Sequence, residues 1–465
     1  MGGLNSAHLA RPAGRAAAAR RTTGRRAVAA RAALTAALAL GAAVGCRGER
    51  AADVAYDGPF ADVVREAIPK IERAAGLPFK QPPKVERRSR AEVRAFLERE
   101  FADEAAARDM AGQIAAYKLF DLLADTLDVR ALLLDLLTEQ IIGFYDPSTE
   151  VLYVVDEAPD ELRAMTIEHE LVHALQDQYV DLDSLQRLQG ENDRVSAAKA
   201  VIEGEATYEQ LQLHLGLGDI AAAMPGGWDR VRREIRQQST NMPVFSAAPM
   251  VLQETILFPY LSGAEFVRAL KARDSTPILR HPLPASTEQV LHVQAYAPTP
   301  DVPTRVTLPA PRTGEAFYEN GFGEFETRLV LYQWLRDQNA AIRGAAGWDG
   351  DRYVLLHTPG GDGAAWLTVW DSAVDAGEFF NIVDDALARR FRDLRSESLG
   401  PQERRYTGGD RALRLTAVEV QGRPAVLLVD MPRGSRTDDV IDAGAVRLDE
   451  GAAATASAAT AGGGH

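Results

Sequence analysis

The chain has 465 residues, more than a single hydrophobic core usually organises, so roughly two to three structural units are expected. Its formal net charge is -14, and the first 45 residues contain seven Arg but no Asp or Glu, so the remainder is more acidic still. An acidic surface repels phosphate backbones, which excludes nucleic acid as an expected partner.

The N-terminal segment has the layout of an export signal. A basic stretch that ends at Arg31 leads into small apolar residues from Ala32 to Gly45, and this run stops at Cys46, the one cysteine of the chain. The segment resembles a bacterial lipoprotein signal, in which such a cysteine becomes the acylated N-terminus. The resemblance implies a protein of the bacterial cell envelope that is anchored to a membrane through Cys46. A plain signal peptide, the alternative, would give a secreted soluble protein.

The patterns that follow predict a succession of helices and strands. Apolar and charged positions alternate at helical spacing from Phe60 to Leu137, and prolines divide this stretch into two helical parts. Two runs of β-forming residues flank an Asp-Pro turn and predict a hairpin over 141–155. Further helices are expected over 159–179, 196–215, 230–238, 249–272 and 324–343, with a proline-rich loop over 281–311. Near the C-terminus, strands are expected over 353–357, 366–370, 413–420 and 425–430, with a helix over 376–391.

Residues 169–173 read His-Glu-Leu-Val-His, the H-E-x-x-H pattern. On a helix, residues i and i+4 lie on one face, so His169 and His173 can bind one zinc ion while Glu170 reaches the water on the metal. A surface helix with two solvated histidines is the alternative interpretation. Apolar residues on the opposite side of the helix are expected to face the core, and these are Ala164, Ile167, Leu171 and Leu175.

The segment from His169 to Ala174, with Asp177 four residues after the second histidine, resembles the active-site helix of thermolysin-like gluzincins. In that family such an aspartate supports a zinc-bound histidine from behind. The resemblance therefore implies that Asp177 fixes the tautomer of a metal ligand. A solvated acid near a helix end is the alternative.

Catalytic zinc of this class takes two histidines, one acidic ligand and a water. Residues 203–208, Glu-Gly-Glu-Ala-Thr-Tyr, resemble the Glu-Gly-x-Ala-x-Tyr portion of the zinc-ligand helix in aminopeptidase-type gluzincins, which implies Glu203 as the third ligand. Glu203 and Glu205 point about 200° apart on a helix, so only one of them can bind the ion. Periodicity alone leaves Glu205 open as the alternative, because the two glutamates flank the apolar stripe of the helix on either side. Gly204 is expected to let this helix approach the H-E-x-x-H helix closely.

These ligands imply a mechanism in which zinc lowers the pKa of a water and Glu170 takes its proton and returns it to the leaving amine. A further donor usually stabilises the oxyanion. His292 and Tyr260 are the candidates, with an ordinary structural role as the alternative for each. The strand Val151–Val155 is expected at the sheet edge beside the metal, where it would bind extended substrate as an added strand; an ordinary strand is the alternative.

The sequence thus predicts an exported zinc-dependent metallopeptidase, a hydrolase of polypeptide substrates that uses a single zinc ion. Two other interpretations remain: a catalytically silent zincin-fold lipoprotein that acts as an envelope binding or assembly module, and a zinc hydrolase of a non-peptide envelope amide. The expected fold class is α+β, with a mostly helical zincin-like catalytic domain, a small mixed sheet and a smaller C-terminal α/β unit of ββαββ type. The expected boundaries are 1–45 for the signal peptide, 46–57 for a tether, 58–140 for a helical region, 141–300 for the zincin-like core, 301–345 for a linker and helix, 346–448 for the C-terminal unit and 449–465 for a disordered tail.

Overall fold

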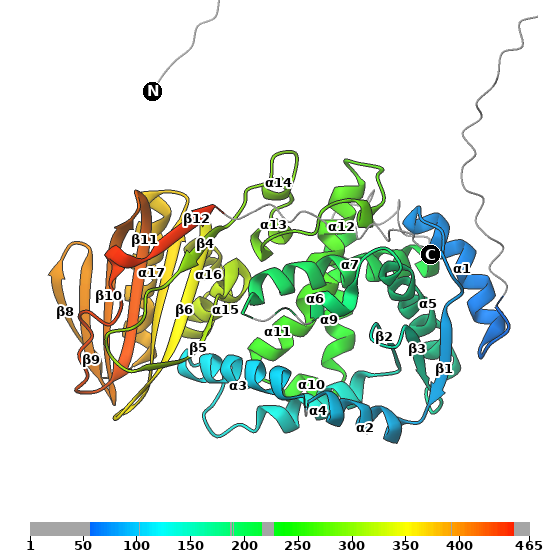
Figure 1. The fold of residues 1–465 in the computed structure, drawn as a ribbon, viewed down its shortest axis with the longest axis horizontal. Coiled ribbons are helices and arrows are strands. Elements are labelled where there is room, and N and C mark those ends of the chain that lie inside the picture. The colour runs from blue at the N-terminus through cyan, green and yellow to red at the C-terminus, as the bar shows by residue number, and fades with distance from the viewer. Residues whose placement is uncertain are drawn as a thin grey trace, which may run out of the picture. The chain divides into compact units, whose positions relative to one another are not determined.

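The computed structural model describes residues 56–450 except 102, 187, 189, 216–226 and 392. The predicted signal peptide, the acylation site Cys46, most of the tether and the tail from residue 451 lie outside the described residues. Within the described part of the chain, no helix is long and apolar enough to span a membrane. The predicted α+β class is confirmed (Figure 1).

The N-terminal part of the described chain contains four helices and a strand where the sequence pattern predicted two helical parts. Gly76, at φ 71°, ends the first helix in the left-handed conformation that glycine tolerates. Ser89 and Glu92 form a capping box that starts the second. The intervening strand buries only Val85, so its charged side chains conceal its pattern. The elements are α1 (Ala61–Ala75), β1 (Lys84–Arg88), α2 (Arg90–Glu100), α3 (Glu104–Leu119) and α4 (Val129–Gln140).

A three-stranded mixed sheet follows, with the order β1-β3-β2. The predicted hairpin is present as β2 (Gly143–Asp146) and β3 (Val151–Val155), which pair antiparallel, while β1 pairs parallel with β3. The prediction that Val151–Val155 forms an edge strand is therefore wrong. The charged strand β1 covers one side of β3, which leaves β2 as the edge strand that contacts α5 (Asp160–Asp177).

Two long helices, α5 and α7 (Asn192–Leu215), lie against one another close to their predicted ranges. The helix predicted over 249–272 is interrupted by a π-helical segment that begins at Pro259, a residue without an N–H to donate. The neighbouring segments are α6 (Leu182–Gln186), α9 (Gly227–Thr240), α10 (Pro243–Ala247), α11 (Met250–Phe258), η1 (Pro259–Gly263) and α12 (Ala264–Lys271).

The segment 281–311, expected as a loop, contains regular structure. Ser286 caps a short helix by accepting a hydrogen bond from the backbone N–H of Gln289. The segment 301–345 was expected as a linker and a helix over 324–343; the structure has two helices in that helical range, and the first contributes the fully buried residues Val330 and Leu331 to the core. The elements here are η2 (Ile278–Arg280), α13 (Thr287–Leu291), α14 (Val293–Tyr296), β4 (Thr304–Thr307), β5 (Glu315–Asn320), α15 (Gly323–Leu335) and α16 (Gln338–Ala345).

A seven-stranded sheet forms the C-terminal part, with the order β5-β6-β7-β11-β10-β9-β8. Every neighbouring pair is antiparallel, and the sheet has more strands than the expected ββαββ unit because the polar hairpin β8–β9 carries little apolar signal. The elements are β6 (Trp348–Thr358), β7 (Gly361–Trp370), α17 (Ala373–Arg390), β8 (Arg395–Gly400), β9 (Glu403–Gly408), β10 (Arg411–Val420), β11 (Arg423–Pro432), η3 (Ala443–Ala445) and β12 (Arg447–Glu450).

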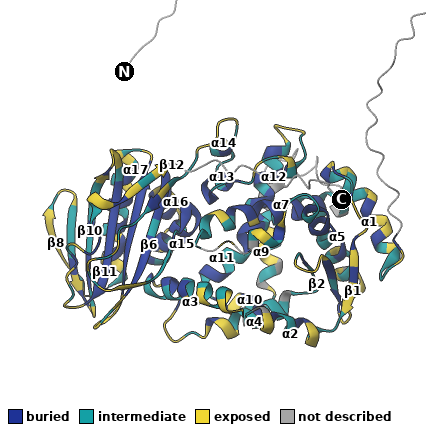
Figure 2. Ribbon diagram, viewed as in Figure 1, coloured by how far each residue is buried: buried dark blue, intermediate teal, exposed yellow. Residues whose placement is uncertain are grey.

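Both faces of this sheet are covered, as the buried positions along its central strands show (Figure 2). Consecutive residues of a strand point to opposite faces of the sheet, so Leu355 and Leu356 belong to two different hydrophobic cores. The core that contains Leu355 continues through α15 and α17 into α3, α7 and α11, so the helical part and the sheet share one hydrophobic core. Asp351 ties the two parts together, because its carboxylate accepts hydrogen bonds from the backbone N–H groups of Phe322 and Gly323 at the start of α15.

Candidate metal centre

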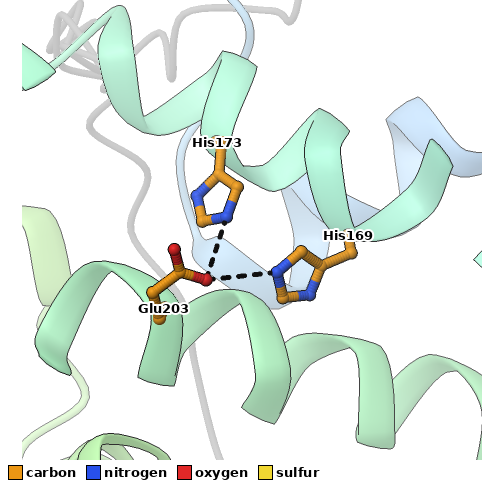
Figure 3. A group of neighbouring side chains, drawn as sticks. All are labelled: His169, His173 and Glu203. Atoms are coloured by element: carbon orange, nitrogen blue, oxygen red, sulfur yellow. Dashed lines mark hydrogen bonds and ion pairs between the residues drawn. The ribbon is translucent and has the colours of Figure 1, made fainter. Parts of the chain in front are cut away.

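The H-E-x-x-H pattern lies on α5, and the predicted core face is largely confirmed. Ile167, Leu171 and Leu175 are buried in the core beneath the small sheet, whereas Ala164 is partly exposed. The opposite face presents His169 and His173 to α7 (Figure 3). The helical period therefore separates packing residues from donors, as expected from the sequence.

Three side chains meet between α5 and α7. Glu203 Oε2 lies 3.4 Å from Nε2 of His169 and 3.4 Å from Nε2 of His173 (Figure 3). All three side chains are mostly shielded from solvent, with exposed fractions of 13%, 10% and 17% for His169, His173 and Glu203. The structure thus brings together the two histidines and the glutamate that were predicted as ligands.

The spacing of these donor atoms suits tetrahedral zinc. Zinc bonds to histidine nitrogen and carboxylate oxygen are about 2.0–2.2 Å long, so neighbouring ligands of a tetrahedral site are about 3.4 Å apart. The two distances from Glu203 Oε2 to the histidine nitrogens match that edge length. Two imidazoles and one carboxylate also form the donor set of open catalytic zinc sites, in which water takes the fourth position.

A residue that sequence reasoning missed, Gln176, fixes the tautomer of His173. The Gln176 amide nitrogen donates to the carbonyl oxygen of Ile202 at 3.0 Å and to Glu205 Oε2 at 2.9 Å. Its Oε1 atom therefore faces His173 Nδ1, 2.8 Å away, and must accept the Nδ1–H. This arrangement leaves Nε2, on the side of Glu203, as the ring nitrogen of His173 that is available to a metal ion.

The supporting role predicted for Asp177 is not what its contacts indicate. Asp177 accepts a hydrogen bond from the Tyr145 hydroxyl at 2.8 Å and from the backbone N–H of Leu182 at 3.1 Å. It therefore joins the end of α5 to β2 and to the following loop. At 100° per residue, positions 176 and 177 lie about 60° and 40° from His173 on opposite sides around the helix, and Gln176 is the one whose amide contacts α7.

Glu205 lies behind the three donors and does not join them. It is fully buried, and its Oε2 atom accepts the hydrogen bond from Gln176. Burial raises the pKa of Glu205 to about 7, against the opposing effects of Gln176 and Lys271. The predicted choice of Glu203 as ligand and Glu205 as a supporting residue thus matches the geometry.

Glu170 is held on the side of α5 that faces the small sheet. Its Oε2 atom accepts a hydrogen bond from the backbone N–H of Tyr145, 2.9 Å away. Tyr145 lies on the edge strand β2, so the outer edge of that strand faces Glu170. The edge strand beside the predicted base is therefore β2, with Glu170 fixed against it.

The tyrosine side chain of Tyr260 lies beside the candidate metal ligands, with its ring centroid 6.3 Å from that of His169. The negative charge of Glu203, followed by burial, raises the pKa of Tyr260 well above its ordinary value, and a hydrogen bond with Glu203 contributes to this shift. Tyr260 belongs to η1, and π-helical segments inside helices occur frequently at functional sites. Of the two predicted oxyanion donors, it is the one that the structure brings to the site.

Two glycines allow η1 to approach α7. A Cβ atom at Gly204 would lie 2.2 Å from the backbone carbon of Gly263, and one at Gly263 would lie 1.9 Å from the carbonyl oxygen of Ala200. The prediction that Gly204 brings α7 close to α5 is wrong, because the partner across Gly204 is η1. This contact positions Tyr260 beside Glu203, one residue away from Gly204 on α7.

His292 lies elsewhere. Its Nε2 atom is 3.1 Å from Oε1 of Glu324 and 3.0 Å from a guanidinium nitrogen of Arg328, both on α15. Within the described part of the chain, its contacts do not include the histidine pair or Glu203. His292 therefore belongs to a polar cluster between α13 and α15.

The pKa values of Glu170, Glu203 and His173 reflect two opposing effects, burial and the attraction between the carboxylates and the histidines. Burial raises the pKa of Glu170, although both histidines oppose that change. For Glu203, the effect of burial is outweighed by the charges of His173 and His169, so its pKa lies well below the ordinary value. For His173, burial would lower the pKa, but Glu203 and Glu170 raise it to about 9.

Comparison with known proteins gives one match. A family described as a domain of unknown function, DUF8575, matches residues 312–441. No curated protein matches the chain, and no solved structure does. The matched region runs from β5 to β11 and leaves out α5, α7 and η1, so the similarity concerns the C-terminal sheet and its helices and not the metal centre.

Proposed function

We propose that this protein is a zinc-dependent metallopeptidase in which His169, His173 and Glu203 hold the metal. The observation that carries the proposal is the position of Glu203 Oε2, at 3.4 Å from both histidine nitrogens on a neighbouring helix. Bound zinc would supply a Lewis acid that polarises the scissile carbonyl and acidifies a water molecule. The reaction class rests on the donor set together with the glutamate between the two histidines.

The other residues of the centre then have defined tasks. Glu170 accepts the proton of the attacking water at its free carboxylate oxygen and transfers it to the nitrogen of the leaving amine, and its hydrogen bond to Tyr145 holds the side chain in place. The Tyr260 hydroxyl donates a hydrogen bond to the oxyanion that develops during attack. Gln176 holds His173 in the tautomer that exposes Nε2.

The substrate class follows from the strand next to Glu170. The backbone N–H of Tyr145 points away from β3 and is taken by Glu170, so the outer edge of β2 runs beside the proposed base, and its remaining outward backbone groups can pair with an extended chain. We infer that a polypeptide lies along β2 as an added strand. Anchoring in the cell envelope through Cys46 is part of the proposal and rests on the N-terminal sequence.

A paired experiment tests this function. Purified wild type and the Glu170→Gln variant are incubated with a library of unstructured peptides, and their zinc content is measured in parallel. The variant should retain zinc and lose about 10²- to 10⁴-fold in cleavage rate, because it lacks the proton acceptor. Equal cleavage by both proteins would contradict the mechanism. Zinc without cleavage in the wild type would favour a binding module or an amidase of non-peptide envelope material.

A further inference from the structure

A second group of carboxylates lies apart from the three zinc donors. It consists of Glu288 on α13, Asp301 between α14 and β4, and Asp371 directly after β7, and each offers an oxygen atom within 4.8 Å of the others. Asp301 and Asp371 are exposed, whereas Glu288 is 94% shielded because only 6% of its surface is accessible. The group thus has one deep member and two at the surface.

Among the described residues, the carboxylate of the deep member, Glu288, has no hydrogen-bond or ion-pair partner. Within the described part of the chain, no N–H or O–H group donates to the Glu288 carboxylate, and its surroundings act on it through burial and the negative charges of Glu324, Asp301, Asp371 and Asp193. Together these raise the pKa of Glu288 to about 9. A buried carboxylate normally has hydrogen-bond donors or a cation, because burial without them is costly.

Nearby cationic side chains are committed to other acids. Arg328 pairs with Glu324, and Arg423 pairs with Asp349, although Arg423 also acts on Asp371 from a distance. The three carboxylates therefore converge without a Lys or Arg paired to any of them among the described residues. Without a cation, Glu288 holds a proton at neutral pH, and a cation bound between the three groups would take the place of that proton.

We propose that Glu288, Asp301 and Asp371 bind a Ca²⁺ ion that joins the helical part of the protein to the C-terminal sheet. Ca²⁺ takes six to eight oxygen ligands at about 2.3–2.6 Å, so ligands on opposite sides of one ion are about 5 Å apart. The mutual distances of up to 4.8 Å fit that span, and water molecules complete the shell. Zinc is disfavoured here because the group has no nitrogen or sulfur donor.

The position of the group gives the ion a structural role. The backbone N–H of Thr287, beside Glu288, donates to Asp193 in the first turn of α7 at 3.0 Å, and the Thr287 hydroxyl accepts from the backbone N–H of Phe325 on α15 at 3.1 Å. An ion bound to Glu288 and Asp371 would therefore connect α7, which carries Glu203, to the end of β7. This inference does not depend on the peptidase proposal.

The test is calcium binding by the purified zinc-loaded protein, measured by titration calorimetry and by the melting temperature. Ca²⁺ at about one hundred times its Kd should raise the Tm by roughly 3–5 °C, with tetramethylammonium chloride of equal ionic strength as the salt control. Glu288→Gln and Asp371→Asn should each abolish the heat of binding and the Tm shift. The exposed Glu378→Gln on α17 removes the same charge outside the group and should keep both.

The outcomes are distinct. Loss of calcium binding in Asp371→Asn supports the site even if Glu288→Gln does not fold, because Asp371 is exposed and its replacement leaves the core intact. Absence of calcium binding in the wild type would overturn the proposal, as would binding that survives both substitutions. Zinc content is measured in every sample, so a failure of the first metal centre is recognised separately.

Discussion

The buried polar side chains of the C-terminal sheet and those at the junction of α5 and α7 differ in their hydrogen-bond partners. In the sheet, the Asp351 carboxylate accepts from the indole N–H groups of Trp348 and Trp366, at 3.1 and 2.9 Å, as well as from two backbone N–H groups. At the helix junction, the Nε2 atoms of His169 and His173 share one oxygen of Glu203. All the hydrogen bonds that the Asp351 carboxylate can accept are supplied by the protein. At the helix junction, by contrast, three possible metal-ligand atoms converge on one point.

This difference separates a structural site from a chemical one. Asp351 fastens α15 to the sheet, and none of its oxygens is left for a ligand. His173 is supported from behind by Gln176 and, through Gln176, by Glu205, while the nitrogen atoms of both histidines that face Glu203 lie at the spacing of metal ligands. Substitutions in the two regions should therefore have different readouts, activity and metal affinity in one and stability in the other.

The largest effect outside the three ligands and Glu170 is expected at Tyr260. Tyr260→Phe removes the hydroxyl that would bind the oxyanion, so kcat should fall by about 10²- to 10³-fold with the zinc content unchanged. His292→Ala, at the other candidate position, is the matched control and should keep kcat. Steady-state kinetics on one peptide substrate decide between them. A larger loss of kcat in His292→Ala than in Tyr260→Phe would show that Tyr260 is not the residue that stabilises the oxyanion.

A smaller effect is expected for the support of His173. Gln176→Ala removes the acceptor for Nδ1–H and should weaken zinc binding by about 10- to 100-fold, as measured by competition with a chelator. Asp177→Asn should leave zinc affinity near the wild-type value, because Asp177 bonds to Tyr145 and Leu182. The reverse ranking would restore Asp177 to the role that the sequence predicted.

The glycine contact between α7 and η1 should be visible in stability. Gly204→Ala introduces a Cβ atom against the backbone of Gly263, so the free energy of unfolding should fall by about 1–3 kcal/mol in urea titrations. Gly377→Ala on α17 is the control, because no heavy atom lies within 4 Å of its Cβ position. That substitution should raise helix stability by up to about 1 kcal/mol. Equal effects at both positions would mean that α7 and η1 do not pack as described.

The smallest effect concerns Glu326, a buried acid at the base of the shared core. Burial raises its pKa to about 7, against hydrogen bonds from Tyr117 and Asn192 that lower it. The folded state therefore holds a proton that the unfolded state has lost, and stability falls as pH rises from about 4.5 to 7. Between pH 6 and pH 7 this group should account for about 1 kcal/mol. Glu326→Gln should flatten that part of the profile, and an unchanged slope would assign it to another group.

The sequence predicted what helical periodicity and local chemistry determine. The spacing of His169 and His173 sets one face of α5, and the Asp-Pro turn sets the hairpin before it. Two features were not predicted because they depend on contacts between residues distant in sequence. β1 pairs with β3 despite its charged residues, and the close contact between Gly204 and Gly263 places the π-helical segment that carries Tyr260 beside α7.

Gln176 could have been anticipated in part. It stands three residues after His173, within reach on the next helical turn, but a polar residue at that spacing has no distinctive signature. Its role becomes visible when Ile202 and Glu205 occupy its amide nitrogen, which requires α7 to be in place. The oxyanion candidates likewise needed the structure, since His292 and Tyr260 both follow the metal helices in the chain.

The central claim is that α5 and α7 hold zinc through His169, His173 and Glu203. Zinc per chain, measured by mass spectrometry of metals after gel filtration, tests it directly in wild type, Glu203→Ala and Glu205→Gln. We predict about one zinc ion per chain in the wild type, little in Glu203→Ala and near-normal content in Glu205→Gln. A wild type without zinc, or a Glu203→Ala variant that keeps its full content, would contradict the account.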